Sequence, residues 1–426
     1  MTKRIAIIGT GISGLSSAYL LNKQHDLKVY EANDYIGGHT ATKNVTVNNK
    51  TYAIDTGFIV YNEWTYPNFI KLMETLKVET QPTEMSFSVK NKKTKMEYNG
   101  NTINSLFAQR RNILRPSFWR LVLDIVKFNK LCKSHIAENR ETDDITLQQF
   151  ITQHNLSDVF THNYILPMCA AIWSTSLEAS ANFPLSFFLK FFNNHGLLNI
   201  TNRPQWFTLV GGSSQYIAPL IESFSSKISV NDAVKSVVKV DDHFVVVSAK
   251  GEETFDEVIF ACHSDQALKM LTAKPQNAIN IRGYKEVLEA IPYSLNEVVL
   301  HTDTSVLPER PLAWASWNYE IEGAKAEASR PAAVTYNMNI LQRVESDTTF
   351  CVTLNNTQAI SPDKVLGTYY YAHPQFSPEM VSAQERREEI CGKEGIHFCG
   401  AYWYNGFHED GLRSALDVCQ RFGVSL

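Results

Sequence analysis

The feature that most constrains this chain is a glycine-rich turn close to its N-terminus. Residues 9–14 (GTGISG) follow the apolar run 5–8 and precede the apolar stretch 15–21, and residues 27–30 (LKVY) then have the composition of a second strand. A strand, a helix and a second strand in this order predict a parallel β-α-β unit. A glycine hexapeptide between the first strand and the helix is typical of a dinucleotide-binding turn.

Each glycine of this turn has its own expected role. Gly9 permits the tight turn, Gly11 lets a pyrophosphate approach the backbone, and Gly14 lets the helix pack closely on the strand. The N-terminus of the helix offers partial positive charge to the phosphates. Glu31 ends the second strand, where its carboxylate can accept hydrogen bonds from the ribose hydroxyls and would repel a 2′-phosphate, which disfavours NADP. The alternative is a glycine turn without a ligand, and the strand, helix and acid together make it the weaker interpretation.

Two further segments favour FAD over NAD. Residues 37–40 (GGHT) and 55–57 (DTG) lie beyond the first β-α-β unit and contain three more glycines. A long ligand that runs past the pyrophosphate requires such close approaches of the backbone, whereas an ordinary loop needs one glycine at most. A pair of turn glycines is the simpler alternative for residues 37 and 38.

Length and composition narrow the class of protein further. The 426 residues predict two to three domains. The 40 basic and 44 acidic residues give a net charge of −4, so no nucleic-acid partner is expected. The seven cysteines are an odd number without metal-ligand spacing, which predicts a reducing, cytoplasmic environment and no metal site. No apolar run approaches the roughly eighteen residues of a membrane span.

Four features together resemble the flavin amine oxidase superfamily. They are the glycine turn with Glu31, residues 37–40, residues 55–57, and a terminal glycine turn before a last helix, which is expected at 410–422. The resemblance implies an α/β protein, with a Rossmann-like FAD-binding domain (GR2-type) and an inserted α+β substrate domain. Residues 208–213 (TLVGGS) resemble the segment where the chain returns to the FAD-binding domain. The FAD-binding domain would comprise residues 1–82, 205–275 and 385–426, and the substrate domain a helical part, 83–204, and a sheet part, 276–384.

The resemblance also assigns the cofactor site residue by residue. The residues expected to hold FAD are Gly9, Gly11, Ser13, Gly14, Glu31, Ala32, Gly37, Gly38, His39, Thr40, Gly57, Phe58, Ile59, Val234, Gly400, Glu409, Gly411 and Leu412. Val234 would meet the adenine through its backbone, and the last helix would direct N–H groups at the flavin, which would stabilise the charge of its reduced form. FAD is expected to bind noncovalently, because the C-terminal segment lacks the cysteine that some relatives use to attach it.

The chain departs from the amine oxidases at one position. The resemblance places their lysine within residues 293–300 (YSLNEVVL), where this chain has Asn296. Among the residues expected beside the flavin, His408 and Tyr404 can exchange protons and are the candidate catalytic residues. A buried structural histidine is the alternative for His408.

Several segments resemble a bacterial subgroup of these flavoproteins that is commonly encoded beside cyclopropane fatty acid synthase relatives. They are 57–62 (GFIVYN), 203–206 (RPQW), 299–303 (VLHTD), 314–319 (WASWNY) and 406–411 (GFHEDG). This resemblance implies modification of a fatty acid: an unsaturated or methyl-branched lipid acyl chain, or another apolar small molecule, would be desaturated or otherwise oxidised.

Two local patterns are compatible with a lipid partner, and each has a simpler alternative. Phenylalanines 183, 187, 188, 191 and 192 have near-helical spacing and could line a tunnel, although an aromatic core is the more common use of such a stripe. Arg110, Arg111, Arg115 and Arg120 alternate with Phe107, Phe118 and Trp119, as in a surface that contacts the inner face of an anionic membrane, although a solvated helix face is simpler.

The sequence therefore predicts an FAD-dependent oxidoreductase that abstracts hydride from a lipid acyl chain. An amine oxidase that produces peroxide is the first alternative. A non-enzymatic, FAD-stabilised protein that binds a lipid or a partner is the second. The sequence does not define an oligomeric state.

Overall fold

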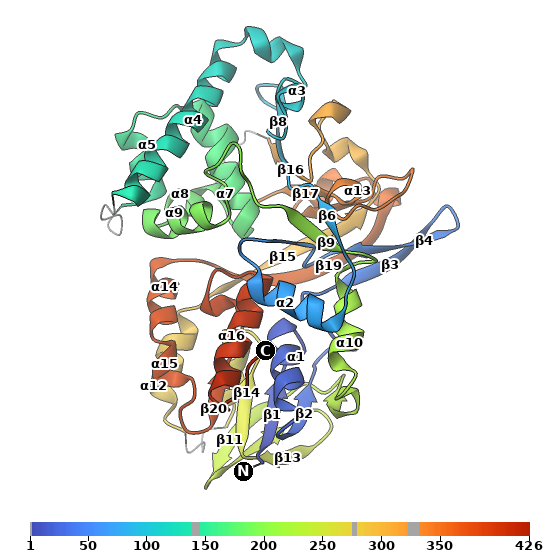
Figure 1. Ribbon diagram of the computed structural model, residues 1–426, viewed down its shortest axis with the longest axis vertical. Coiled ribbons are helices and arrows are strands. Elements are labelled where there is room, and N and C mark those ends of the chain that lie inside the picture. The colour runs from blue at the N-terminus through green and yellow to red at the C-terminus, as the bar shows by residue number, and fades with distance from the viewer. Residues whose placement is uncertain (1, 139–144, 275–278, 323–331) are drawn as a thin grey trace.

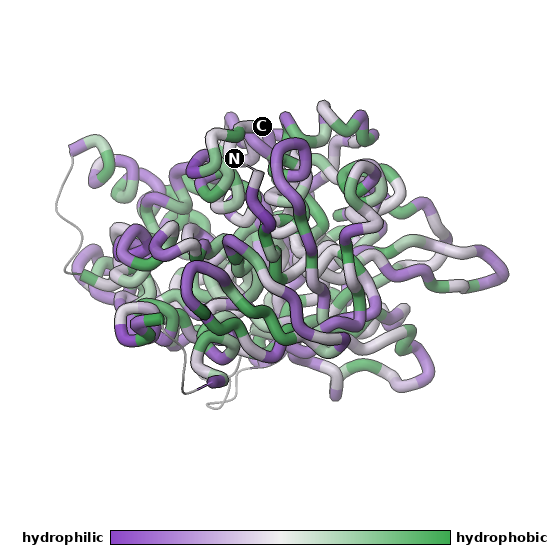
Figure 2. The backbone as a smooth tube through the Cα atoms, turned by 90° about the horizontal axis from the view of Figure 1, so that it is seen from below, coloured by the Kyte–Doolittle hydropathy of each residue, from purple (hydrophilic) through white to green (hydrophobic). Residues whose placement is uncertain are grey.

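The computed structural model describes residues 2–138, 145–274, 279–322 and 332–426. Figure 1 shows two layers of structure along the long axis of the molecule: a lower part that contains both chain termini and an upper part that ends in a group of helices. The strands and helices carry hydrophobic stretches through the middle of the molecule, and the most hydrophilic segments lie in the outer loops (Figure 2).

The lower part is built on a five-stranded parallel sheet. Its strands, in spatial order, are β10 (Ile228–Ser229), β2 (Asp26–Tyr30), β1 (Arg4–Ile8), β14 (Glu257–Phe260) and β20 (Ile396–Phe398). Helix α1 (Ile12–Leu21) connects β1 and β2, so the predicted β-α-β unit is confirmed. The central strands are buried on both faces, which explains their uninterrupted apolar sequences.

Helices and a small sheet cover this parallel sheet. The elements are the sheet β11 (Ser236–Val240), β12 (His243–Val247) and β13 (Glu252–Phe255), and the helices α10 (Ile217–Ile221), α11 (Ser264–Thr272), α12 (Ile281–Glu289), α14 (Pro378–Glu385), α15 (Arg387–Ile390) and α16 (His408–Gln420). The predicted domain boundary at 275/276 lies outside the described residues. Helix α12 follows it, yet Tyr284, Val287 and Leu288 pack into the core of the lower part, because α11 and α12 lie side by side.

The upper part contains a seven-stranded sheet. Its order is β19 (Val365–Pro374), β15 (Tyr293–His301), β18 (Cys351–Leu354), β17 (Val334–Asn337), β16 (Trp317–Ile321), β7 (Phe87–Asn91) and β8 (Met96–Asn99). All neighbours are antiparallel except β16 and β7. Residues 83–204, predicted to be mostly helical, contain the helices α3 to α9 and also supply the strands β7 and β8 of this sheet.

Helices of the same segment stand over the far end of that sheet. The longest is α4 (Pro116–Ala137), and α5 (Leu147–Gln153), α7 (Leu166–Trp173), α8 (Leu177–Ala181) and α9 (Leu185–Asn194) pack against it or against one another (Figure 1). Phe183, Phe188 and Phe192 are buried in this helical core, which confirms the simpler interpretation for most of the phenylalanine stripe. Within the described residues, no helix combines the length and the apolar character needed to cross a membrane.

Two sequence motifs meet where the parts join. The hairpin β3 (Thr42–Val47) and β4 (Lys50–Asp55) ends at Asp55, whose buried carboxylate accepts hydrogen bonds from the Thr42 hydroxyl (2.6 Å) and from the backbone N–H and hydroxyl of Ser213 (both 2.9 Å). Burial raises the pKa of Asp55 to about 6. Residues 55–57 and 208–213 are therefore joined directly, and β5 (Val60–Asn62), β9 (Trp206–Leu209) and β6 (Thr80–Thr83) continue from them as a connecting sheet.

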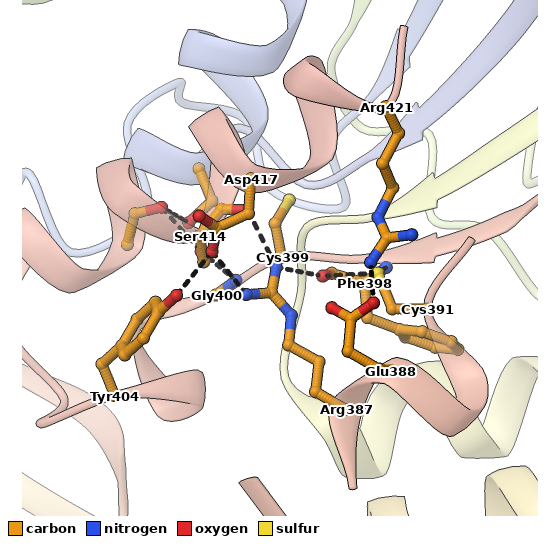
Figure 3. A network of polar contacts seen from close by, with 12 residues as sticks. Arg387, Glu388, Cys391, Phe398, Cys399, Gly400, Tyr404, Ser414, Asp417 and Arg421 are labelled. Atoms are coloured by element: carbon orange, nitrogen blue, oxygen red, sulfur yellow. Dashed lines mark hydrogen bonds and ion pairs between the residues drawn. The ribbon is translucent and has the colours of Figure 1, made fainter. Parts of the chain in front are cut away.

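A buried arginine fixes the last strand of the parallel sheet to the last helix. Arg387 donates to the Asp417 carboxylate (2.6 Å), to the Ser414 carbonyl (2.9 Å) and to the Phe398 carbonyl (3.1 Å), as Figure 3 shows. Ser414 in turn accepts a hydrogen bond from the Gly400 N–H (2.8 Å). The guanidinium group thus holds together β20, the glycine turn after it and the middle of α16.

We expect Arg387→Met to lower the free energy of unfolding by about 2–4 kcal/mol, because it removes the hydrogen bonds to two buried backbone carbonyls and the cation beside Asp417. Arg386→Met is the matched control. Arg386 lies on the surface and pairs with Glu389 and Glu286, so its loss should cost less than about 1 kcal/mol. Urea unfolding of both variants measures this difference, and equal losses would contradict the role given to Arg387.

Candidate active site

A large cavity, with a volume of about 1020 Å³, lies between the carboxyl ends of the parallel strands and the upper sheet. Of the residues predicted to hold FAD, those that line it are Gly9, Gly11, Ser13, Glu31, Ala32, Gly37, Gly38, His39, Gly57, Phe58, Ile59, Val234, Gly400 and Gly411. The carboxyl ends of parallel strands are where α/β sheets bind ligands, and this volume lies at the upper end of ordinary ligand sites.

The glycine turn shows which position faces a ligand and which faces the protein. A Cβ atom on Gly11 would have no atom within 4 Å, so this position opens into the cavity. A Cβ on Gly14 would lie 2.0 Å from the Gly9 carbonyl oxygen, and so Gly14 permits α1 to contact the turn. A Cβ on Gly38 would approach the Gly11 Cα to 3.0 Å. The two glycine segments therefore lie against each other at one wall of the cavity.

Glu31 is held in a fixed position at the end of β2. One carboxylate oxygen accepts hydrogen bonds from the Thr10 backbone N–H (3.1 Å) and from the Thr10 hydroxyl, and the other accepts from the Asn33 backbone and side-chain amides (both 2.9 Å). The carboxylate is thus oriented before any ligand binds, and its position agrees with the ribose contact expected of it.

Two helix N-termini converge on the cavity. The Ser13 hydroxyl at the start of α1 donates to the carbonyl of Gly411 at the start of α16 (2.8 Å), and a Cβ on Gly411 would lie 2.7 Å from Ile12 Cγ2. Both helices therefore direct their free N–H groups and the positive ends of their dipoles into the same space. A phosphate and the pyrimidine part of a flavin are the two groups of FAD that such ends stabilise.

The last helix begins at His408, two residues earlier than predicted, because the Asp410 carboxylate accepts a hydrogen bond from the Phe407 N–H and closes the first turn. Glu409 therefore lies in the first turn of the helix rather than before it. Its carboxylate accepts hydrogen bonds from the backbone N–H groups of Asn68 (3.0 Å) and Phe69 (2.8 Å) and so caps helix α2 (Pro67–Leu76). The Glu409 side chain thus serves a neighbouring helix, whereas the cofactor contact predicted for this segment is one through the backbone N–H groups of the helix start.

Three other predicted residues also lie behind the cavity wall. Gly14 packs on the turn, and Leu412 is fully buried in the core. Thr40 shares a hydrogen bond with the Tyr216 hydroxyl (2.6 Å), which lies 3.0 Å from His408 Nε2. Thr40 therefore supports the cavity through Tyr216 and His408.

The two candidate catalytic residues have different surroundings. His408 lines the cavity, stacks on Phe58 with a ring separation of 3.8 Å and has its Nε2 engaged by Tyr216. Burial lowers the pKa of His408 to about 3, so the ring is neutral at physiological pH. The Tyr404 hydroxyl donates to Asp417 (2.6 Å) on the far side of α16 (Figure 3), and Tyr404 is not among the residues that line the cavity. The prediction that Tyr404 is catalytic therefore finds no support in its position.

Three further histidines form a cluster on the same cavity. The ring of His39 lies 6.0 Å from that of His263 and 5.5 Å from that of His373. Burial lowers the pKa of His39 and of His263 to about 4 and that of His373 to about 3. His39 bonds the Ala372 backbone, and its Nε2 is buried without a partner in the described structure. A buried, unsatisfied nitrogen at this wall indicates that the cavity receives a ligand with a donor group.

His373 owes its orientation to Asn296, the residue predicted to stand at the position of the lysine. Asn296 on β15 is fully buried, and its amide nitrogen lies 2.9 Å from His373 Nδ1 on the paired strand β19. The Asn296 oxygen accepts a hydrogen bond from Asn355 (2.8 Å), and its nitrogen also donates to the Ser294 carbonyl, so the amide donates to His373. His373 Nδ1 is therefore an acceptor, and the proton lies on Nε2.

The part of the cavity beyond the dinucleotide segments is apolar and aromatic. Its walls are formed by side chains from α7, α9, the upper sheet and the segment before α16, among them Trp173, Phe191, Trp317, Tyr336, Phe376 and Phe407. Phe191 and Phe407 stack with a ring separation of 5.2 Å. The charged residues of the described lining, Glu31, Asp232, Lys235 and Lys269, all belong to the dinucleotide end.

Sequence reasoning did not identify His263 or His373 as residues of the site. Burial raises the pKa of Cys262 to about 12, so this thiol is not a nucleophile. The alternation of Tyr371 and His373 along β19 was the available signal, because alternate residues of a strand share one face.

The residues present fit FAD. The open position at Gly11 and the oriented Glu31 suit the dinucleotide. The unsatisfied His39 nitrogen lies between these residues and the upper sheet. The N-terminus of α16 faces the far half of the cavity.

Comparisons with known proteins agree with this geometry. Residues 12–336 match the family described as flavin containing amine oxidoreductase. Similar solved structures include a candidate protoporphyrinogen oxidase from Exiguobacterium sp. 255-15, with 15% identity, a TM-score of 0.69 and 99% of both chains covered. A second is a CLA-producing fatty acid isomerase from P. acnes, with 13% identity and a TM-score of 0.68, covering 99% of this chain and 98% of that one. A third is cyclohexylamine oxidase from Brevibacterium oxydans IH-35A, with 14% identity and a TM-score of 0.67, covering 99% of this chain and 100% of that one. None of the curated proteins matches the sequence. The predicted fold class is confirmed.

We expect Gly11→Val to fold normally and to bind FAD at least tenfold more weakly. Its backbone φ of −67° suits any residue, and the added side chain would occupy space needed by the pyrophosphate. Gly14→Ala is the contrasting variant, because its Cβ overlaps the Gly9 carbonyl and should destabilise the fold. Flavin titration and thermal unfolding of the flavin-free proteins separate the two effects. A Gly11→Val protein that retains full affinity would contradict this assignment.

The neutral His408 predicts a pH dependence of stability. In the unfolded chain a histidine takes up a proton near pH 6.5, whereas His408 in the folded protein stays neutral to about pH 3. The unfolded state therefore binds more protons in this window, and stability falls as the pH falls. Between pH 7 and pH 5, the wild-type protein should lose about 2 kcal/mol more than His408→Phe. Urea unfolding of the flavin-free proteins at both pH values measures this difference, and parallel losses would show that His408 is not held neutral.

Proposed function

Because the chain belongs to the family of flavin-containing amine oxidoreductases and is an FAD-dependent oxidoreductase, we propose that it oxidises a lipid acyl chain at an aliphatic or allylic carbon. Bound FAD would supply the electron acceptor for this reaction. The proposal covers the substrate class and the noncovalent attachment of FAD.

The observation that carries this proposal is the uncharged, aromatic character of the substrate half of the cavity. Trp173 and Phe191 from the helices face Trp317 and Tyr336 from the upper sheet. The described lining has no carboxylate in this half, so a protonated amine would lose its hydration without gaining a counter-ion. An acyl chain needs only apolar contacts over its length.

Asn296 also argues against amine oxidation. A lysine at this position would bring a titratable nitrogen to the cavity, whereas the buried Asn296 orients His373. His373 then presents an N–H group on Nε2. The chain thus offers an uncharged donor at this position, which suits a substrate whose reacting part is a hydrocarbon.

Relatives of similar fold include proteins named for both substrate classes. The P. acnes protein is a fatty acid isomerase, and the Brevibacterium protein oxidises an amine. The first supports our proposal, because a fatty acid is accommodated within the same fold. The second keeps amine oxidation as the alternative to be tested.

We expect a monounsaturated or methyl-branched acyl lipid to bleach the flavin absorbance of the purified protein under anaerobic conditions, and primary and secondary amines to leave it unchanged. Phe191→Ala should raise the lipid concentration for half-bleaching about tenfold, because its side chain lines the cavity. Ile200→Ala, an exposed position nearby, is the control and should have no effect.

The other outcomes each point elsewhere. Bleaching by amines alone would contradict the proposal and favour an amine oxidase. A flavin that no lipid and no amine reduces would favour a non-enzymatic, FAD-stabilised binding protein.

A further inference from the structure

Exposed apolar side chains gather at one end of the molecule. The described residues include fourteen large hydrophobic side chains that are exposed, and six of them fall between positions 103 and 126: Ile103, Ile113, Leu114, Trp119, Leu123 and Val126. Leu114 is 85% exposed and Ile103 is 79% exposed. They belong to helix α3 (Ile103–Leu106), the short helix η1 (Arg110–Leu114) and the first half of α4, at the end of the molecule opposite to the termini (Figure 1).

Most of these side chains form one surface. The Trp119 indole N–H donates to the Ile113 carbonyl (2.8 Å), and its ring lies 5.4 Å from that of Phe107. Leu123 and Val126 follow Trp119 by four and seven residues, which places all three on one face of α4. We call the surface formed by residues 103–130 the basic apolar face.

Folding alone does not explain the apolar character of this face. Phe118, Leu121 and Phe128, on the opposite side of α4, are fully buried and supply the contacts that hold the helix on the molecule. The predicted surface, in which arginines alternate with Phe107, Phe118 and Trp119, is therefore corrected in part, because Phe118 is a core residue. A surface helix normally directs polar residues outward, whereas the outer side of α4 also carries Trp119 and Leu123.

Cations surround the exposed apolar side chains. Residues 103–130 contain six basic residues, Arg110, Arg111, Arg115, Arg120, Lys127 and Lys130, and one acidic residue, Asp124. Asp124 is buried, pairs with Arg120 and accepts hydrogen bonds from Ser157. Arg110 and Arg111 donate to backbone carbonyls, of Phe107 and Lys95, rather than to carboxylates. The segment has a net charge of 6 − 1 = +5 in a protein of net charge −4, so the remainder of the chain carries −9.

This combination identifies the partner by its chemistry. A second copy that used the same face in a twofold dimer would bring +5 against +5, which disfavours that arrangement. Apolar side chains with a tryptophan among them, surrounded by arginine and lysine, match the interface of an anionic bilayer, where acyl chains accept the apolar groups and headgroups accept the cations.

We propose that the protein docks peripherally on an anionic lipid surface through the basic apolar face. Helix α4 of this face packs on α9, which supplies Phe191 to the wall of the cavity. Docking is independent of the substrate, because it would occur equally if the enzyme oxidised a soluble molecule.

The test is co-sedimentation of the FAD-loaded protein with vesicles of phosphatidylcholine, with and without phosphatidylglycerol. We expect binding to the anionic vesicles, weakening as the salt concentration rises, and little binding to the neutral ones. Leu114→Asp combined with Leu123→Asp should reduce binding to anionic vesicles at least tenfold. Both side chains point into solvent, so flavin content and thermal unfolding should not change.

Ile200→Asp combined with Val240→Asp is the matched control, since these side chains are also exposed but lie outside the face. It should bind vesicles like the wild-type protein. Equal binding to neutral vesicles, or an unaffected Leu114→Asp/Leu123→Asp variant, would overturn the proposal. A shift of the wild-type protein to a dimer that this variant abolishes would assign the face to a second copy instead. Anaerobic flavin bleaching by a soluble short-chain acyl substrate should stay unchanged in the variant, which separates docking from the proposed reaction.

Discussion

The contact on which the rest of the site depends is the meeting of α1 and α16 at their N-termini. Ser13 and Gly411 are 398 residues apart in the chain, yet their hydrogen bond and the absence of a side chain at Gly411 let two helix starts share one wall of the cavity. Closing so long a loop costs only somewhat more conformational entropy than closing a short one. Arg387 supplies part of the compensation, since it joins β20 to the middle of the same helix.

The electrostatics of the cavity divide it into two halves. At the dinucleotide end, the Glu31 carboxylate is held by Thr10 and Asn33 beside the turn that precedes α1. Toward the upper sheet, burial outweighs every interaction that would hold a proton on His39, His263 or His373, so these rings are neutral donors and acceptors. An uncharged wall preserves the contrast between the two halves, because a charge near the reacting carbon would attract water into an apolar space.

The parts of the site that sequence reasoning predicted are those in which one local segment determines the geometry. The GTGISG turn, Glu31 and residues 37–40 each follow directly from a strand or a glycine, and the structure places Gly11, Glu31 and Gly38 on the cavity. The orientation of His373 was not predictable, because it requires the pairing of β15 with β19 and the burial of Asn296 between them. The role of the Glu409 side chain was not predictable for a related reason: it accepts a hydrogen bond from Asn68, which lies 341 residues earlier in the sequence. Local patterns predict which residues a turn presents, whereas pairing between distant segments decides what a side chain contacts.

The helical part of the upper domain has two surfaces that face apolar surroundings for different reasons. Its inner side forms an aromatic core and presents Trp173 and Phe191 to the cavity. Its outer side has Leu114 and Leu123 in solvent, where hydrophobic burial contributes nothing to folding, so these residues must be explained by something outside the chain. Helix α4 carries most of the outer apolar residues and packs on α9, which carries Phe191. If an anionic bilayer covers the outer side, docking would bring an enzyme that oxidises acyl chains to the surface that holds them.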